Sequence, residues 1–445
     1  MKQIVVERTT DRRTRSLLYK VAPRRLAIFG GTTTFADCLV ALRYLADPRQ
    51  LVQGPAIIEY EQAFARQVGV RYAYSFCHAR VGLYGLLLAL GVGPRDEVLL
   101  QVPTHVVVSN AIRYTGARPV YVDCRLDNYN IDLEQAEQRI TPRTKVLILQ
   151  HTFGIPVELD AALDLARRYG LDVIEDCVHA LGATYDGRQV GSFGRAAIFS
   201  TEHAKTISTT MGGMVVTDDV ELAAKVQAFQ QRCAYPSASQ TALHILKLVL
   251  FHCLLEPHLY YYTWMIYELF GQHYPFPHPV TDEEGRGGRP ANYEQRLSNA
   301  QATIGLRQLQ RLDANLAHRR ATATAYAVRL SKEGFDVPHP PAKAEPAFVR
   351  YPVWVKDPDV VRRVAVQHAT LGEWFRSILS WPDSPVYDDY EMGSCLRAEE
   401  AIRHLVNLPT HPWVSAQDVE TIISAVVRAT TMVRSRDTIK KGHEP

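Results

Sequence analysis

The sequence predicts an α/β protein with a mostly parallel sheet covered by helices, followed by a smaller C-terminal α/β domain. Short apolar runs alternate with helical patterns between about residues 51 and 235, which is typical of parallel strands joined by crossover helices. Several of these runs have no polar face, as expected when helices cover both faces of a sheet. The length of 445 residues, 47% of them hydrophobic, suffices for two or three compact domains.

The elements of the large sheet follow one another along the chain. Within the stretch from Tyr74 to Leu83 a short apolar strand gives way to a helix. Further strands are predicted at residues 97–102, 119–123, 146–152, 171–175, 196–201 and 213–217. Apolar residues at helical spacing predict helices at residues 57–68, 81–90, 133–140, 159–169 and 220–232.

Residues 242–270 are unusually apolar. Lys247, Glu256, Pro257 and His258 interrupt them before the ~20 apolar residues that a membrane-spanning helix needs. We therefore expect two amphipathic helices with a hinge at Pro257. The favoured interpretation is that they pack against the protein's own core or a second subunit, and the alternative is attachment to a membrane surface.

The rest of the chain predicts a second domain. Residues 275–290, rich in Pro, Gly and charge, form a loop or linker, and a long helical stretch at 296–331 joins the two domains. A strand at 349–355 and helices at 359–369 and 416–429 complete the second domain, and the last dozen residues form a frayed tail. The expected divisions are an N-terminal extension at 1–50, a large domain at 51–295 with an apolar insertion at 240–272, a small domain at 296–432 and a tail at 433–445.

Charge and cysteine content exclude several classes of function. The chain has 50 Lys and Arg against 47 Asp and Glu, and the net charge of +3 is too small to indicate a nucleic-acid partner. The seven cysteines are odd in number and scattered, and the histidines lack paired spacing, so we expect neither disulfides nor a metal site. We expect reduced thiols and therefore a cytoplasmic protein, and residues 1–25 show no pattern of a secretory signal.

Two constellations of polar residues follow predicted strands. Asp176 ends one strand and His179 follows it, at the carboxyl edge where ligands of open α/β sheets bind. Ser200 ends another strand and Lys205 lies five residues further on. A lysine at a buried strand end is costly unless it is paired or used. A reactive lysine together with a carboxylate that could hold a ring nitrogen protonated is what pyridoxal phosphate requires of its protein.

A third stretch suits a phosphate. The helix that begins at about Ala79 and Arg80 follows directly on a strand, and its first turn offers backbone N–H groups. Arg80 can add a bidentate guanidinium. The alternative is that Arg80 forms a structural salt bridge at a buried helix start.

The order of these and other motifs resembles the DegT/DnrJ/StrS family of pyridoxal-phosphate sugar aminotransferases. Weaker similarity continues through residues 296–302 with 308–309, and through 395–399 and 408–412, so that the resemblance covers most of the chain. The main motifs, in chain order, are Gly54-Pro55, residues 61–65, 91–98 and 116–123, Glu175-Asp176, the run from Phe199 to Lys205, and Gly212-Gly213.

The resemblance implies a fold-type-I pyridoxal-phosphate transferase that acts as a homodimer on small molecules. It would transfer an amino group, with glutamate as the donor, to a nucleotide-linked keto-sugar in the biosynthesis of amino sugars and glycans or of secondary metabolites. Lys205 would bond to the cofactor and then move the proton between substrate and cofactor. Asp176 would pair with the pyridine nitrogen, and His179 would lie near the ring hydroxyl.

The remaining cofactor contacts include departures from the family pattern. Ser200 and the backbone of Ala79 and Arg80 would bind the phosphate, although His78-Ala79-Arg80 replaces the common Ser-Gly-Thr. His105 stands where an aromatic residue usually stacks on the ring, and an imidazole stacks with less area. Met211 replaces an acid that is usual after the lysine.

Two other functions would keep the fold and the cofactor. One is a sugar dehydratase-like enzyme, but a histidine replaces the lysine in such relatives and Lys205 is present here. The other is a non-catalytic regulator or membrane-associated scaffold. The departures and the apolar segment favour this alternative, whereas the complete set of Lys205, Asp176, His179 and Ser200 argues against it.

Overall fold

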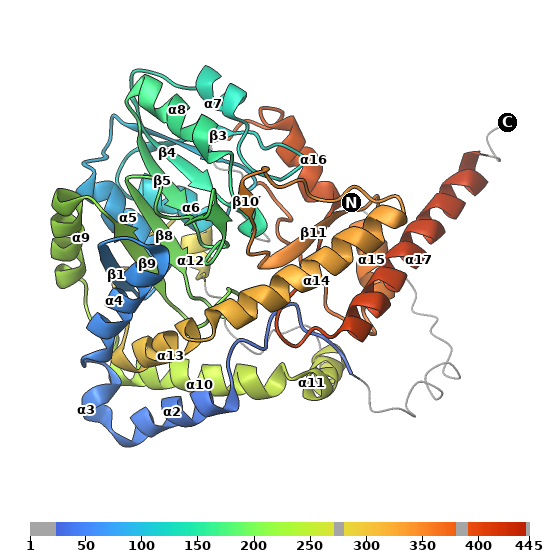
Figure 1. Ribbon diagram of the computed structural model, residues 1–445, viewed down its shortest axis with the longest axis horizontal. Coiled ribbons are helices and arrows are strands. Elements are labelled where there is room, and N and C mark those ends of the chain that lie inside the picture. The colour runs from blue at the N-terminus through green and yellow to red at the C-terminus, as the bar shows by residue number, and fades with distance from the viewer. Residues whose placement is uncertain (1–23, 271–279, 380–389, 442–445) are drawn as a thin grey trace.

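A computed structural model describes residues 24–270, 280–379 and 390–441 (Figure 1). Its largest feature is a seven-stranded sheet with the strand order β1-β9-β8-β5-β4-β2-β3, in which β9 runs antiparallel to both of its neighbours, β1 and β8. The strands are β1 Tyr72–Phe76, β2 Glu97–Gln101, β3 Arg118–Val122, β4 Thr144–Gln150, β5 Asp172–Asp176, β8 Ala196–Ser200 and β9 Gly213–Thr217. The predicted α/β class and the predicted strands are therefore confirmed.

Helices cover both faces of this sheet (Figure 1). Alternate residues of a strand point to opposite faces, so Val98 and Leu100 of β2 belong to one apolar cluster and Leu99 to the other. The helices around the sheet are α4 Ala56–Val68, α5 Ala79–Ala89, α6 Val106–Arg113, α7 Leu133–Gln138, α8 Leu159–Tyr169 and α9 Val220–Arg232, with a 3₁₀ turn η1 at Thr152–Gly154. The sequence did not predict α6, because its three consecutive valines favour a strand.

The smaller domain is built on a two-stranded antiparallel sheet of β11 Arg350–Trp354 and β12 Leu405–Pro409. The helices α15 Pro358–Ala365, α16 Leu396–His404 and α17 Ala416–Lys441 accompany it. Because α17 reaches Lys441, the predicted frayed tail is helical over most of its length; residues 442–445 lie outside the described residues. A second small sheet contains β6 Thr184–Tyr185, β7 Arg188–Gln189 and β10 Ala344–Glu345.

The predicted helix at 296–331 is two helices, α13 Asn299–Leu309 and α14 Leu312–Lys332. The break follows from the caps: Gln310 ends α13, and Arg311 precedes α14 with a non-helical φ of −114°. The first turns of α14 pack Leu312 and Leu316 against the large domain, while Tyr326 and Leu330 belong to the core of the small one. α14 therefore contributes side chains to both cores.

The apolar segment forms α10 Ala238–Leu254 and α11 Pro257–Phe270, which meet at a bend of 102°. No single helix in the described part of the chain is long and apolar enough to cross a membrane, although this bent pair passes the same test of length and composition when taken together. α10 lies on α13 beside α2 Phe35–Ala46 and α3 Pro48–Leu51 (Figure 1). The predicted hinge and the predicted packing on the protein's own core are both present.

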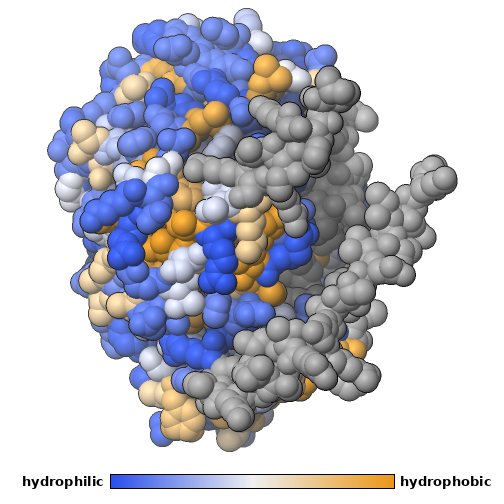
Figure 2. All heavy atoms as spheres, turned by 90° about the vertical axis from the view of Figure 1, so that its right-hand side faces the viewer, coloured by the Kyte–Doolittle hydropathy of each residue, from blue (hydrophilic) through white to orange (hydrophobic). Residues whose placement is uncertain are grey.

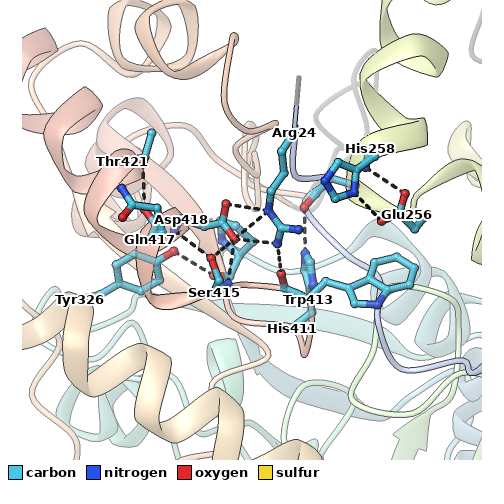
Figure 3. Close-up of polar contacts among 12 residues, drawn as sticks. Arg24, Glu256, His258, Tyr326, His411, Trp413, Ser415, Gln417, Asp418 and Thr421 are labelled. Carbon is cyan, nitrogen blue, oxygen red and sulfur yellow. Dashed lines mark hydrogen bonds and ion pairs between the residues drawn. The ribbon is translucent and has the colours of Figure 1, made fainter. Parts of the chain in front are cut away.

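The chain from Arg24 to Thr33 is an arm that connects the small domain with α11. Arg24 donates to Asp418 of α17 at 2.8 Å and to the Trp413 carbonyl at 2.7 Å, and the His411 ring contacts the Ala27 carbonyl (Figure 3). The Arg25 N–H donates to the carbonyl of Pro257, the first residue of α11. Of the predicted loop at 275–290, residues 271–279 lie outside the described residues, and the remainder contains a short helix, α12 Asp282–Gly285.

Candidate active site

One edge of the large sheet collects the predicted site residues. Strands β2, β4, β5 and β8 run parallel, so their carboxyl ends share this edge, and the antiparallel β9 begins there. Asp176 ends β5, Ser200 ends β8, and His105 follows β2. Side chains from segments far apart in the sequence therefore meet where ligands bind in open α/β sheets.

Asp176 is a buried carboxylate with an unused oxygen. Its side chain is 1% exposed, and Oδ1 accepts a hydrogen bond from the Val178 N–H at 3.1 Å. Oδ2 is buried and has no hydrogen-bond partner among the described residues. Burial raises the pKa of Asp176 to about 6, even though the Val178 N–H and the charge of Lys205 favour the ionised form.

Lys205 lies in the loop after β8, and its side chain is half-buried. Burial lowers the pKa of Lys205 to about 8; Arg350 acts in the same direction, and the carboxylates of Glu202 and Asp176 oppose it. The Nζ atom lies 4.5 Å from the centre of the Trp374 ring. The result is an amine that carries or releases its proton near neutral pH.

His179 is buried on the turn after β5. Its ring stacks on Trp374 with 4.3 Å between centroids and an interplanar angle of 12°. Burial, followed by the charges of Lys205 and Arg350, lowers the pKa of His179 well below its usual range, so the imidazole is neutral. Its Nδ1 is a second buried polar atom for which the described residues offer no partner.

The start of α5 and Ser200 meet at Gly213. In the sheet register Gly213 pairs with Ser200 on one side and with Phe76, the last residue of β1, on the other. A Cβ atom on Gly213 would lie 2.2 Å from the Ala79 nitrogen, so only glycine permits this approach. No side chain caps the first turn of α5, which begins beside Gly213, the partner of Ser200 in the sheet.

Arg80 takes the structural role that the sequence left as an alternative. Its Nε lies 2.6 Å from Oε1 of Glu284 in α12, and both side chains are largely buried. The guanidinium is thus already paired with a carboxylate, which corrects the expectation that it supplies the charge at a phosphate. The backbone N–H groups at a helix start can bind an anion without this side chain.

His105 caps the N-terminus of α6, where its Nδ1 accepts from the Val107 N–H at 3.4 Å. It lies close enough to His179 for its charge to lower the pKa of that residue. Its neighbour Thr104 donates to Gln150 at the end of β4 at 2.7 Å. The structure therefore brings His105 to the edge that holds Asp176 and His179.

Glu175 supports the site from beneath the sheet edge. It accepts hydrogen bonds from the N–H groups of Gly191, Phe193 and Gly194 and contacts His151 at 3.2 Å. Burial alone would raise the pKa of Glu175, but these partners outweigh it and hold the pKa below its usual value. Both oxygens of this carboxylate have hydrogen-bond partners that hold the loop after β7, whereas one oxygen of Asp176 has none in the part of the chain that the structure describes.

Three residues near Lys205 were not predicted. Arg350 is 6% exposed, and its guanidinium lies 3.4 Å from the Trp374 ring centre. Glu202 contacts His203 and supplies a carboxylate beside Lys205, although Met211 replaces the acid that is usual after the lysine. The sequence could have marked Arg350 as a candidate, because an arginine inside an apolar strand is unusual. Trp374 lies in a stretch without periodicity, so no pattern predicted its place in the site.

The residues present fit pyridoxal phosphate. A buried carboxylate oxygen without a partner suits the protonated ring nitrogen, and a neutral imidazole with an unused nitrogen suits a ring substituent. The uncapped start of α5, in contact with Gly213, suits the phosphate. An amine with a lowered pKa suits covalent attachment to the aldehyde.

Comparisons with known proteins agree in sequence and in structure. A profile of the DegT/DnrJ/EryC1/StrS aminotransferase family matches residues 36–427. GDP-perosamine synthase of Caulobacter vibrioides is 31% identical over 378 residues, which are 84% of this chain and 90% of the relative. GDP-perosamine synthase of Escherichia coli O157:H7 is 32% identical over 293 residues, 64% of this chain and 68% of the relative.

A solved structure extends the likeness to the fold. The aminotransferase TlmJ of Streptoalloteichus hindustanus superimposes with a TM-score of 0.71 at 26% identity, covering 92% of this chain and 100% of that one. The match includes the large sheet and the small domain together.

Proposed function

The chain belongs to the DegT/DnrJ/EryC1/StrS aminotransferase family, and from this membership we propose that it transfers the amino group of glutamate to a nucleotide-linked keto-sugar. It is a pyridoxal-phosphate-dependent sugar aminotransferase. The donor and the class of acceptor are the parts that we propose. Two relatives named GDP-perosamine synthase support a sugar carried on a nucleotide.

The observation that carries the proposal is the pair of buried polar atoms on Asp176 and His179 that have no partner among the described residues. Leaving such groups unpaired costs free energy in the folded protein. Their retention at one sheet edge, beside an amine of lowered pKa, is explained if a ligand pairs with them. When bound, pyridoxal phosphate supplies an electron sink for the carbon that bears the transferred amine.

We propose a separate role for each of the residues around the cofactor. Lys205 accepts the proton from the substrate carbon and returns it, which its pKa of about 8 permits near neutral pH. Asp176, as a carboxylate, keeps the ring nitrogen protonated, and His179 orients the ring from the side of its hydroxyl. Ser200 and the N–H groups of Ala79 and Arg80 hold the phosphate at the N-terminus of α5.

Two further residues complete the proposed site. His105 covers the ring from the N-terminus of α6, where its neighbour Thr104 is held by Gln150. Arg350 places a buried positive charge beside Lys205, which favours a donor with carboxylates such as glutamate. A homodimer and a cytoplasmic location remain predictions from the sequence.

The proposal is tested by isotope transfer. Purified protein with pyridoxal phosphate, ¹⁵N-glutamate and a panel of nucleotide-linked keto-sugars should yield a ¹⁵N-labelled amino-sugar nucleotide and an equal amount of 2-oxoglutarate. Lys205→Ala should yield neither. Release of 2-oxoglutarate without any amino sugar would contradict the acceptor class, and failure of every amino donor would contradict transamination.

A further inference from the structure

The helix pair α10 and α11 presents apolar side chains to solvent. From Leu243 to Leu254 the exposed residues of α10 are Leu243, Leu246, Leu250 and Cys253. The three leucines are 45–49% exposed and lie on one side of the helix. A surface helix ordinarily turns charged residues to water, so this helix has the reverse arrangement on its outer side.

The neighbouring helix α2 repeats the pattern. Its exposed apolar residues Phe35, Leu39 and Leu42 follow helical spacing. On their inner sides α2 and α10 bury Cys38 and Ile245 in one cluster with Ala300 of α13. Because both helices pack on α13, their apolar outer sides point away from the body of the protein.

α11 continues this surface. Its exposed apolar residues, each about half exposed or more, are Leu259, Tyr262, Ile266 and Leu269. The other side of α11 contacts the protein: the Tyr260 hydroxyl lies 2.8 Å from Thr370, and the Arg25 guanidinium lies 4.0 Å from the centre of the Trp264 ring. We call the exposed apolar residues of α2, α10 and α11 the apolar face. In Figure 2 apolar side chains are visible at the lower end of the molecule, the level at which α2 and α11 lie in Figure 1.

This arrangement suits a surface that the protein lies on better than a bilayer that it crosses. α10 buries Ile245 and Leu248 in one cluster with Ala300 and Ile304 of α13, and it bends by 102° into α11. With its inner side packed on the protein, α10 can enter a bilayer only by lying in the plane of the lipid–water interface. Exposed apolar patches of this extent mark interaction sites.

A positively charged segment joins the chain at the same place. Residues 1–23 contain six Lys or Arg against two acidic residues. They lead directly to Arg24 and Arg25, and the Arg25 N–H is bonded to Pro257 at the hinge between α10 and α11. Basic segments beside an apolar face are attracted to anionic lipid headgroups. A symmetric contact between two copies through this face would instead bring two such like-charged segments together.

We propose that the apolar face docks on a membrane surface that contains anionic lipids, with residues 1–23 supplying the electrostatic attraction. The proposal does not rest on the proposed reaction. α10 also lines a pocket near the loop of Lys205, in which Phe251 and His252 lie together with His203. Docking would therefore hold the wall of this pocket against the bilayer.

The test is flotation of the purified holoenzyme with vesicles. One set is phosphatidylcholine with about 30% phosphatidylglycerol, and the other is phosphatidylcholine alone. We expect at least tenfold more bound protein with the anionic vesicles, and a loss of most binding at high salt because the headgroup attraction is screened. The double variant Leu246→Glu/Leu250→Glu should bind at least tenfold less.

The matched control is Val328→Glu, because Val328 on α14 is exposed by 49%, as is Leu243. This control should bind as the parent does. Circular dichroism and the visible band of the bound cofactor verify folding of each variant, and Leu250→Gln replaces the double variant if that one unfolds. The proposal is overturned if the parent ignores anionic vesicles, if the α10 variant binds like the control, or if that variant changes from dimer to monomer, which would assign the face to a second copy.

Discussion

Asp176 is a buried carboxylate with one oxygen that has no hydrogen-bond partner among the described residues and would gain one from a bound ligand. The neighbouring Glu175 is equally buried but accepts three backbone hydrogen bonds, whereas Asp176 accepts one and keeps Oδ2 unused. The two carboxylates therefore differ in pKa, which is below its usual value for Glu175 and raised to about 6 for Asp176. Local pairing, and not burial, separates a structural acid from a candidate functional one.

Replacing Asp176 by Asn should stabilise the cofactor-free protein. The folded-state pKa of about 6 lies above the unfolded value of about 4, so ionisation of Asp176 opposes folding above pH 6. We expect the Asn variant to gain on the order of 2 kcal/mol at pH 8 in urea unfolding, and this gain to vanish as the pH falls from 6 toward 4. The same variant should lose more than about a hundredfold in transamination, since a neutral amide cannot hold the ring nitrogen protonated.

The control is Asp172→Asn at the start of the same strand, where the carboxylate is paired with Arg195 at 2.9 Å near the surface. It should leave activity unchanged and give no stability gain at pH 8. A cofactor-free Asp176→Asn protein that is no more stable than the parent at pH 8 would show that the buried carboxylate is satisfied in solution.

At the scale of the element, the phosphate end of the site depends on how β9 meets α5. The register of β9 between β1 and β8 sets Gly213 against the first residues of α5. Cβ would meet backbone atoms of Ala79 and His78 there, within 2.2–2.5 Å, and backbone cannot rotate away as a side chain can. The position of the helix N-terminus is thus fixed by the sheet.

Gly213→Ala should therefore weaken the cofactor more than it weakens the fold. The added methyl group has to displace the first turn of α5, which we expect to cost about 1–3 kcal/mol in stability and to lower the affinity for pyridoxal phosphate at least tenfold. The measurement is fluorescence titration of the cofactor-free protein. Gly93→Ala is the control, because no atom lies within 4 Å of a Cβ there; equal affinities of the two variants would contradict this account.

The elements that the sequence predicted best are those that either have one buried and one exposed face or are buried completely. α8, α9 and β9 have the predicted ends, since each has either a clear amphipathic period or complete burial. α6 was missed because Val106 to Val108 favour a strand, and its helical form is imposed by the crossover between the parallel strands β2 and β3. The break between α13 and α14 was missed because Gln310 and Arg311 carry no breaking residue.

For the site, the sequence could place the residues that follow strands but not those that come from the small domain. Asp176, Ser200 and Lys205 are close to one another in the chain, so the strand pattern alone puts them at one edge. Trp374 and Arg350 reach Lys205 only through the packing of the two domains. The ion pair of Arg80 with Glu284 likewise depends on a contact across 204 positions of sequence that no local pattern contains.

At the scale of the whole molecule, the N-terminal arm links parts that are distant in sequence. Arg24 binds Asp418 on α17, while Arg25 contacts α11 (Figure 3 shows the Arg24 contacts). Burial would raise the pKa of Asp418, but Arg24 and Ser415 hold it below its usual value. The arm thus fastens the small domain to the helix pair.

Asp418→Asn should loosen this arm. The Arg24 side chain is 34% exposed, and partly exposed ion pairs contribute little, so we expect a loss of only about 1 kcal/mol in global stability. Trypsin should nevertheless cut at Arg24 or Arg25 several-fold faster than in the parent under native conditions. Asp359→Asn, which removes an exposed pair with Arg362, should leave the cleavage rate unchanged; identical cleavage of both variants would contradict the role of the arm.

The central claim is that Lys205, Asp176 and the start of α5 form the pyridoxal-phosphate site of an aminotransferase. The most direct measurement is the absorption spectrum of the purified protein with pyridoxal phosphate, before and after addition of glutamate, for the parent and for Lys205→Ala. We expect a visible band that requires Lys205 and that glutamate converts to the near-ultraviolet band of the pyridoxamine form. A band that forms without Lys205, or one that no amino donor bleaches, would contradict the account.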